Sequence, residues 1–522
     1  MSSDPRAPRR DIEDWDVQGI NERITTCKQS HTCKPQDEQK LPSRVLDIGE
    51  PTSETIRLVV PSEGGGAVQT GHYAALSYSW GSCSNFTLTA TTLDSRKRGF
   101  HASELPLTLR DAVQVTRQLG LCYLWIDALC ILQDSEADWK RESARMGDIY
   151  GFAYITIFAF GAKDCQSGLF ARSQYLLGSS FAPDLGDTPK SEQSSDFGES
   201  TDFGDRSDSE EILDFRQTPD LHTFKNEPLN SRGWALQEWH LSSRRLLFER
   251  RRVLFDCFQG PPRREHGHAA YSWKFSSTSN IELKHWGQKF VTALSSRNLT
   301  NPMDKLPAIA GLAQRFAVAC NVPCGRYLAG IWEADLPVSL LWLRGSADGI
   351  LLPSAKEGRP SDYRAPSWSW ASIDGTVGYN VLRCKVVAEI ISCTVRLESN
   401  ENPYGWVTGG CLEIRGQVMT IPYKCVRVDH GGLILRLQTA HRKKGSDRLD
   451  GAVWSDEREE IMLELIKHDQ VVYFLAIGIT RESGHWGLFL QCISENCYSR
   501  IGGGWCESKW VENIGLQTVN IL

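Results

Sequence analysis

The stretch Tyr73-Ala-Ala-Leu-Ser-Tyr-Ser-Trp-Gly81 is the first of three apolar runs that decide the fold of this chain. The others are Cys122-Tyr-Leu-Trp-Ile-Asp-Ala-Leu-Cys-Ile131 and Tyr154-Ile-Thr-Ile-Phe-Ala-Phe160, and a stretch with helical spacing separates each run from the next. Strands that alternate with amphipathic helices predict an α/β fold in which helices cover both faces of a parallel sheet. Such sheets bind ligands at the carboxyl ends of their strands, so functional residues are expected there.

The two intervening stretches are predicted to be helices with one buried face. Thr108 is placed to cap the first helix, with Asp111 three positions on, and Gly120 ends it. The apolar stripe of this helix consists of Leu109, Ala112, Val113, Thr116 and Leu119. The second helix follows Asp138, and the residues that recur along it at helical spacing are Glu142, Met146, Ile149, Tyr150 and Ala153.

Asp127 is the exception within the second apolar run. A strand that is buried on both faces is nearly continuous in apolar residues, so a carboxylate there must be paired or must lie where the strand opens onto a site. Two interpretations are open. Asp127 either caps a helix or pairs with an arginine such as Arg232, or it takes part in ligand binding.

The composition describes a sizeable protein with no general affinity for polyanions. The chain has 522 residues, of which 41% are hydrophobic, and this length favours two or three domains. The net charge of -6 gives no general attraction to nucleic acid or anionic membranes. No apolar stretch reaches the roughly 18 residues of a membrane span, and the polar N-terminus lacks a signal region. We therefore expect a cytoplasmic protein whose 16 cysteines are mostly reduced and buried.

Two segments differ from the α/β pattern. From Pro183 to about Glu211 the chain is rich in Ser, Asp, Glu and Gly, which predicts a disordered acidic insert. From about Leu382 onward, short β-patterned runs are separated by turns, which predicts a β-rich region. That region either senses a partner or covers the preceding domain as a structural sheet.

Several sequence blocks, taken in order, resemble the fungal heterokaryon-incompatibility (HET) domain family. They are the Tyr73–Gly81 run, Leu124–Ile131 with Gln133, Asp138-Trp139 with Glu142, Ile149-Tyr150, and Arg232-Gly-Trp-Ala-Leu-Gln-Glu238. The similarity extends to a lead-in and a companion region through Cys27, His31, Cys33, Leu41–Asp47, Asp304–Gly311, Tyr327–Trp332 and Ala365–Ala371.

This resemblance divides the chain into four predicted parts. Residues 1–60 are the lead-in, and residues 61–260 are the HET domain with its acidic insert at about 183–212. Residues 261–380 are a helical or mixed companion region, and residues 381–522 are a β-rich C-terminal domain.

The family resemblance implies a role in non-self recognition and regulated cell death in filamentous fungi. HET domains are similar to Toll/interleukin-receptor (TIR) domains, which are flavodoxin-like. Some TIR domains cleave NAD at the nicotinamide-ribose bond, and others only assemble signalling complexes. In the TIR pattern a Trp is followed by a catalytic Glu, and the matching positions here are Trp234 and Glu238.

Glu238 is therefore the predicted catalytic residue, because a carboxylate can stabilise the oxocarbenium-like state of N-glycosidic bond cleavage. The predicted substrate-binding residues are Tyr78, Ser79, Trp80, Gly81, Asp127, Gln133 and Trp234. No GxGxxG motif is present, which favours NAD as a substrate over NAD as a bound cofactor, and no cofactor is expected. Protein partners or self-association are expected.

Each of these assignments has a structural alternative. Trp80, Trp125 and Trp234 are also suited to be core anchors. Glu142 fits a helix-surface or capping residue with a structural partner, and Gln237 fits a bond to backbone. At the level of function, the alternatives to an NAD hydrolase are a non-catalytic signalling module and a hydrolase that uses Cys or Asp chemistry.

The cluster Cys27, His31 and Cys33 has the side chains of a metal site but only three ligands. Zinc requires four, and no second pair lies at a standard spacing, so the sequence predicts no metal. A Cys-His nucleophile that uses Cys130 or Cys257 is a further alternative, although buried thiols are usually inert.

Overall fold

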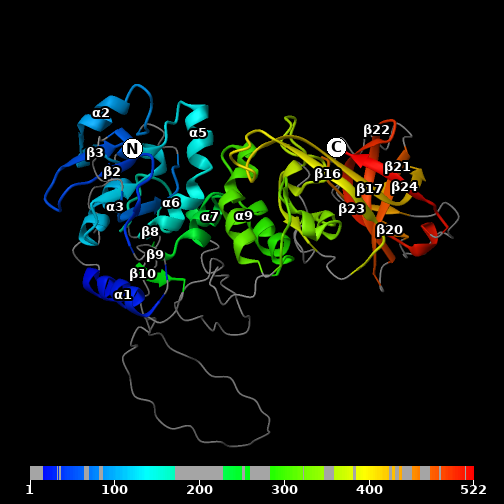
Figure 1. The fold of residues 1–522 in the computed structure, drawn as a ribbon, viewed down its shortest axis with the longest axis horizontal. Coiled ribbons are helices and arrows are strands. Elements are labelled where there is room, and N and C mark those ends of the chain that lie inside the picture. Colours follow the sequence, from blue (N-terminus) through cyan, green and yellow to red (C-terminus); the bar gives the residue numbers. More distant parts are fainter. Residues whose placement is uncertain are drawn as a thin grey trace, which may run out of the picture.

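The computed structural model describes residues 16–31, 33, 37–63, 70–81, 86–170, 227–249, 253–258, 282–320, 322–345, 358–379, 384–422, 426–428, 434–437, 450–458, 471–480, 484–511 and 513–522. The predicted acidic insert at about 183–212 lies outside these residues. Two sheets lie toward opposite ends of an elongated molecule, with helix α9 (Pro307–Ala319) between them (Figure 1). Among the described residues, no helix is long and apolar enough to cross a membrane.

The N-terminal sheet has eight strands and is mixed, whereas the sequence predicts a parallel sheet. Its order is β10-β9-β8-β5-β7-β2-β3-β6. The four central strands β9, β8, β5 and β7 are parallel, and the outer strands pair antiparallel. The strands are β2 (Val45–Asp47), β3 (Thr55–Val59), β5 (Tyr73–Ser77), β6 (Phe100–His101), β7 (Tyr123–Trp125), β8 (Ile155–Phe158), β9 (Arg244–Phe248) and β10 (Val253–Cys257). Short connections, such as the one between β9 and β10, join neighbouring strands as hairpins and so impose antiparallel pairing.

The three apolar runs form the parallel strands β5, β7 and β8 as predicted, but β7 is shorter than its run. It ends at Trp125, and Asp127 begins the short helix α4 (Asp127–Cys130). The Asp127 carboxylate accepts a hydrogen bond from the backbone N–H of Ala128 at 2.7 Å. Asp127 thus lies at the carboxyl end of the strand and not within it, which explains how a buried parallel sheet accommodates it.

Helix α3 (Leu107–Gln118) follows the prediction except at its start. The N-cap position is Pro106, and Thr108 lies inside the helix, where its hydroxyl donates to the carbonyl of Asp164 at 2.9 Å. Thr108 is therefore not a cap. The predicted stripe is buried, and Gly120 follows the helix with a φ of +73° that favours glycine.

The second predicted helix is two helices, α5 (Glu136–Ser143) and α6 (Met146–Phe152). Ser135 caps α5 by accepting a hydrogen bond from the N–H of Asp138 at 3.3 Å. The predicted face is nevertheless buried on both helices, because the break at Ala144 and Arg145 keeps the spacing of the buried side chains.

Helices α6, α7 (Ala235–Leu241) and α9 pack together and join the N-terminal sheet to the middle of the chain (Figure 1). A Cβ built on Gly311 of α9 would lie 2.7 Å from the Cα of Gly147 in α6. Because glycine has no Cβ, Gly147 and Gly311 allow α6 and α9 to approach this closely, and a larger side chain at either position would clash. The middle region has an aromatic core of Trp286, Phe316, Trp332 and Trp370.

The second sheet has ten strands, and every one lies after residue 384, as the β-patterned runs predict. Strands β17, β21, β22, β23 and β24 pair in a closed ring. The strands of this sheet are β15 (Lys385–Val386), β16 (Glu389–Leu397), β17 (Val407–Pro422), β18 (Val426–Val428), β19 (Ile434–Leu437), β20 (Gly451–Ser455), β21 (Val471–Thr480), β22 (Gly484–Ser494), β23 (Cys497–Cys506) and β24 (Leu516–Ile521). The β-patterned runs Cys411–Ile414 and Val418–Ile421 belong to the single strand β17, which continues through Gly416.

Candidate functional site

Polar side chains converge at the carboxyl ends of the parallel strands β5 and β7. Residues 78–81 leave the end of β5, and Asp127 begins α4 just after β7. Arg232 and Glu238 reach the same place from the segment that precedes β9, with Glu238 on α7. This is the edge of the sheet at which the sequence predicts a site.

Arg232 is the centre of this cluster and bridges the two carboxyl groups. Its Nη2 donates to Asp127 Oδ2 at 2.8 Å, and its Nη1 donates to the carbonyl oxygen of Tyr78 at 2.8 Å. The distance from Nη1 to Glu238 Oε1 is 3.7 Å. Burial alone would lower the pKa of Arg232, but the charges of Glu238 and Asp127 raise it, so the guanidinium stays protonated.

Asp127 has a full set of partners, which confirms the pairing interpretation. Besides Arg232 and the N–H of Ala128, the indole N–H of Trp80 donates to its two oxygens at 3.1 and 3.0 Å. Gln133 stabilises the backbone around Asp127, because its Nε2 donates to the carbonyls of Asp127 and Ile131 at 3.1 and 3.0 Å. These contacts fix the orientation of the Asp127 carboxylate.

Glu238 is completely buried, with 0% of its surface exposed. Its Oε2 accepts a hydrogen bond from the hydroxyl of Ser77 at 2.5 Å. Among the described residues, no group donates a hydrogen bond to its Oε1. Burial raises the pKa of Glu238, and the increase persists although Arg232 and Ser77 lower it. A buried oxygen with only a long ion pair and a raised pKa both describe a carboxyl that holds its proton more readily than a solvated glutamate.

Tyr150 lies beside Glu238 and forms part of the inner wall. Its hydroxyl donates to the carbonyl of Leu76 at 3.1 Å. Burial, followed by the charges of Glu238 and Asp127, raises the pKa of Tyr150, so the phenol remains neutral. The inner side of the cluster is thus buried, and its outer side is formed by the partly exposed Trp80 and Arg232.

Gly81 and Ser79 line the turn that follows β5. Gly81 has a φ of +65°, and a Cβ built on it would lie 2.3 Å from the Cβ of Asp164. A close approach to Asp164 therefore accounts for the glycine. Ser79 is half-buried next to Trp80.

Trp234 lies apart from this hydrogen-bonded cluster. Its ring packs edge-to-face against Trp139, with ring centroids 5.6 Å apart, and its side chain hydrogen-bonds to Asp304 of the companion region. Trp125 is likewise buried and packs edge-to-face on Tyr150. The contacts of both tryptophans favour the core-anchor interpretation.

Glu142 belongs to a second, separate network and is not a helix-surface residue. Only 1% of it is exposed, and its Oε2 accepts a hydrogen bond from the hydroxyl of Ser43 at 2.9 Å. Arg44 pairs with Asp138 in the same network. The motif residues Asp138 and Glu142 thus fasten the lead-in to α5. Gln237 accepts from the backbone N–H of Gly311 at 3.2 Å, which confirms its structural alternative.

The predicted site residues omit three members of the cluster, namely Ser77, Tyr150 and Arg232. The sequence predicts Arg232 as a pairing partner of Asp127 and Tyr150 as a residue of a helix face, and both lie in blocks that resemble the HET family. The available signal for Arg232 is its place at the start of the block that ends in Glu238. Nothing in the spacing indicates that both ends of this block point at one site.

Residues 73–238 match the family model of the heterokaryon incompatibility protein (HET), so this part of the chain is a HET domain. The match begins at the first residue of β5 and ends at Glu238, and it therefore includes every residue of the cluster. It confirms the resemblance of the blocks from Tyr73 to Glu238. No match was found among curated proteins or among solved structures.

Proposed function

We propose that this protein acts in non-self recognition and regulated cell death, and that its HET domain does so by cleaving NAD at the nicotinamide-ribose bond. The family match supports the first part of this proposal. The observation that carries the second part is the buried Glu238 carboxyl at the carboxyl ends of β5 and β7, with one oxygen that accepts no hydrogen bond from the described residues.

The sheet order supports a relation to TIR domains. Numbered along the chain, the parallel strands β5, β7, β8 and β9 lie in the spatial order 2-1-3-4. Flavodoxin-like sheets have the order 2-1-3-4-5 and bind ligands where the order reverses. The reversal falls between β5 and β8, and β5 ends at Ser77, which is followed by Tyr78 and Trp80. The antiparallel β10 takes the place where a further parallel strand would lie.

The residues of the cluster have distinct roles in this reaction. Glu238 stabilises the positive charge that develops on the ribose, or holds a ribose hydroxyl, as the nicotinamide leaves. Ser77 and Arg232 orient the Glu238 carboxyl, and the face of Trp80 offers a stacking surface for a flat ring. Water completes the hydrolysis and yields nicotinamide, ADP-ribose and a proton.

Access to Glu238 requires a rearrangement. The carboxyl is covered, whereas 21% of the Arg232 side chain is exposed, so the outer wall of Trp80 and Arg232 is the side from which a substrate approaches. We infer that self-association or a protein partner opens this wall, which makes the activity conditional as a cell-death effector requires.

A non-catalytic signalling module is the second candidate, and one observation favours it. Asp127 is fully paired and Glu238 is fully covered, as in a structural ion network that shapes a docking surface. In that case the cluster supports the fold, and the surface of the HET domain recruits partners.

Nicotinamide release from NAD by the purified full chain tests the proposal, with Glu238→Gln as the key variant. Glutamine keeps the size of the side chain and removes its charge. Glu142→Gln is a matched control, because Glu142 is an equally buried glutamate of the HET domain outside the cluster. We expect turnover in the wild type and in Glu142→Gln, and a loss of at least about a hundredfold in Glu238→Gln. Equal turnover in all three proteins would remove Glu238 from the mechanism, and no turnover by the self-associated wild type would favour the signalling module.

A further inference from the structure

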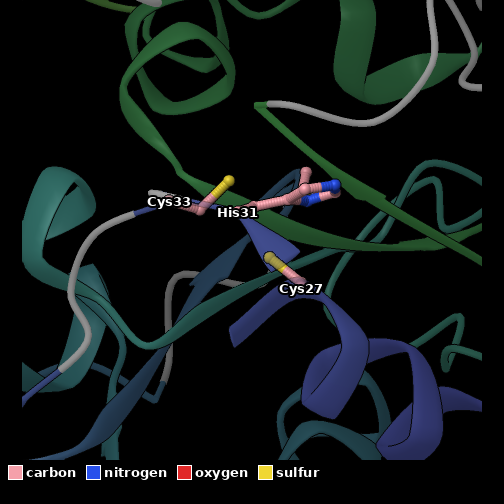
Figure 2. Close-up of side chains that lie close together, drawn as sticks. Cys27, His31 and Cys33 are labelled. Carbon is pink, nitrogen blue, oxygen red and sulfur yellow. The ribbon is translucent and has the colours of Figure 1, made fainter. Parts of the chain in front are cut away.

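Four side chains with metal-binding atoms meet at the edge of the N-terminal sheet, away from the cluster around Arg232. Cys27 lies in the last turn of α1 (Val17–Ser30), His31 caps the end of that helix, and Cys33 follows two positions later. Figure 2 shows these three residues lying close together. The fourth is Cys257, the last residue of β10. One ligand atom from each residue lies within 4.8 Å of the ligand atoms of the other three.

The sequence predicts no metal here because it provides only three ligands in one segment. Cys257 supplies the fourth ligand, and it lies 226 positions after His31 in the chain. The distance from His31 Nδ1 to Cys257 Sγ is 3.2 Å. The fold, and not the local spacing, completes the set of ligands.

We propose that Cys27, His31, Cys33 and Cys257 bind one zinc ion at a structural site. Three cysteines and one histidine are an established ligand set for tetrahedral zinc. Zn–S bonds of about 2.3 Å place tetrahedral sulfur atoms about 3.8 Å apart. The four ligand atoms lie within 4.8 Å of one another, and His31 Nδ1 lies 3.2 Å from Cys257 Sγ, so small shifts of the side chains would bring them to zinc-binding distances. Binding replaces the thiol protons, and no electron is transferred.

The surroundings of the four side chains fit a closed site. Cys27, Cys33 and Cys257 are 1%, 2% and 4% exposed, and Phe255 and Phe258 pack around them. His31 is partly exposed, but four protein ligands fill the tetrahedral positions and leave none for a substrate or a catalytic water. The site is therefore structural and does not compete with the cluster around Arg232 as a catalytic centre.

Arg244 supplies the charge that such a site requires. Three thiolates and Zn²⁺ have a net charge of -1, which is costly to bury without a cation nearby. The fully buried Arg244 donates from its Nη2 to the carbonyl oxygen of Cys33 at 3.0 Å. Arg244 is also the residue opposite Cys257 in the pairing of β9 with β10. A cation adjacent to the ligands stabilises the thiolate form.

The zinc ion would connect the lead-in to the HET domain. The segment from α1 to Cys33 is joined to β10, the edge strand next to β9. This pins the N-terminal helix over the hairpin that follows α7 in the chain, so removal of the metal is expected to release α1 first.

Metal content of the full chain, purified with its thiols reduced and without chelators, tests this site. We expect about one zinc per chain by elemental analysis and a first shell of three sulfurs and one nitrogen by X-ray absorption. Cys257→Ser should lower zinc to background. Cys492→Ser, which changes an exposed cysteine, should retain about one zinc per chain.

Cobalt provides a second measurement that does not depend on the folding of a variant. The wild-type chain, stripped of metal and given Co²⁺, should develop the absorption of a tetrahedral thiolate site with a stoichiometry of one. The absence of both zinc and Co²⁺ uptake in the reduced wild type would overturn the proposal. A disulfide among Cys27, Cys33 and Cys257 in the purified protein, or an absorption shell without sulfur, would also overturn it.

Discussion

Arg232 and Asp127 lie 105 positions apart in the chain, yet the Nη2 of Arg232 lies 2.8 Å from the Oδ2 of Asp127 at the carboxyl ends of two parallel strands. This contact joins the second apolar run to the block that ends in Glu238. The distance from Arg232 Nη1 to Glu238 Oε1 is 3.7 Å, so one cation lies within ion-pair distance of two acidic side chains. The cluster is consequently both a structural element and the candidate site. Its structural role predicts a loss of stability on substitution, and its catalytic role predicts a loss of NAD cleavage.

Arg232→Ala should destabilise the HET domain. It leaves Asp127 buried without its cation and removes the donor to the carbonyl of Tyr78. We expect a loss of about 3 kcal/mol in the free energy of unfolding, measured by denaturant titration. Arg326→Ala breaks an exposed pair with Glu333 and should cost less than about 1 kcal/mol. Equal losses in the two variants would show that the Arg232 pair is no more buried than a surface ion pair.

Asp304→Asn should change the pH dependence of stability. Burial raises the pKa of Asp304 to about 6, although hydrogen bonds from Trp139 and Trp234 lower it in part. Between about pH 4 and pH 6 the folded state therefore binds a proton that the unfolded state has lost, and stability falls as pH rises through this window. Relative to Asp304→Asn, the wild type should lose on the order of 3 kcal/mol from pH 4 to pH 7. Parallel stability curves for the two proteins would contradict the raised pKa.

Gly81→Ala and Gly120→Ala form a matched pair that separates backbone strain from steric clash. Both glycines have positive φ, at +65° and +73°. A Cβ on Gly120 meets nothing within 4 Å, whereas a Cβ on Gly81 would lie 2.3 Å from the Cβ of Asp164. We expect Gly120→Ala to cost about 1 kcal/mol and Gly81→Ala about 2 to 5 kcal/mol, measured by thermal unfolding. Similar costs would show that the turn beside Trp80 is free to move.

Much of the fold could be predicted from the sequence because buried strands and amphipathic helices leave periodic patterns. The Tyr73–Gly81 run, the hairpin of β9 and β10, and the β-rich end all follow such patterns. The antiparallel strands β2, β3 and β6 at the other edge of the first sheet could not be predicted, because their partners are set by tertiary packing. The division of one predicted helix at Ala144 is likewise a local event without a strong breaker such as proline.

The candidate site could be predicted in part. A strand-end position for Asp127 could be predicted because it is a charged residue in an otherwise apolar run. The choice of Glu238 as a site residue comes from the family resemblance. The contacts of Arg232 with Asp127 and of Trp234 with Asp304 join residues far apart in the chain, and no sequence pattern indicates them. The convergence of Cys257 on the N-terminal cysteines could not be predicted for the same reason.

Cellular NAD after induced expression tests the central claim most directly, because the trigger and the assembly state are then those of a living cell. We predict that expression of the wild type lowers NAD before viability falls, and that Glu238→Gln, produced at equal level, leaves both NAD and viability unchanged. Cell death with NAD maintained, or the same NAD loss with Glu238→Gln as with the wild type, would contradict the account.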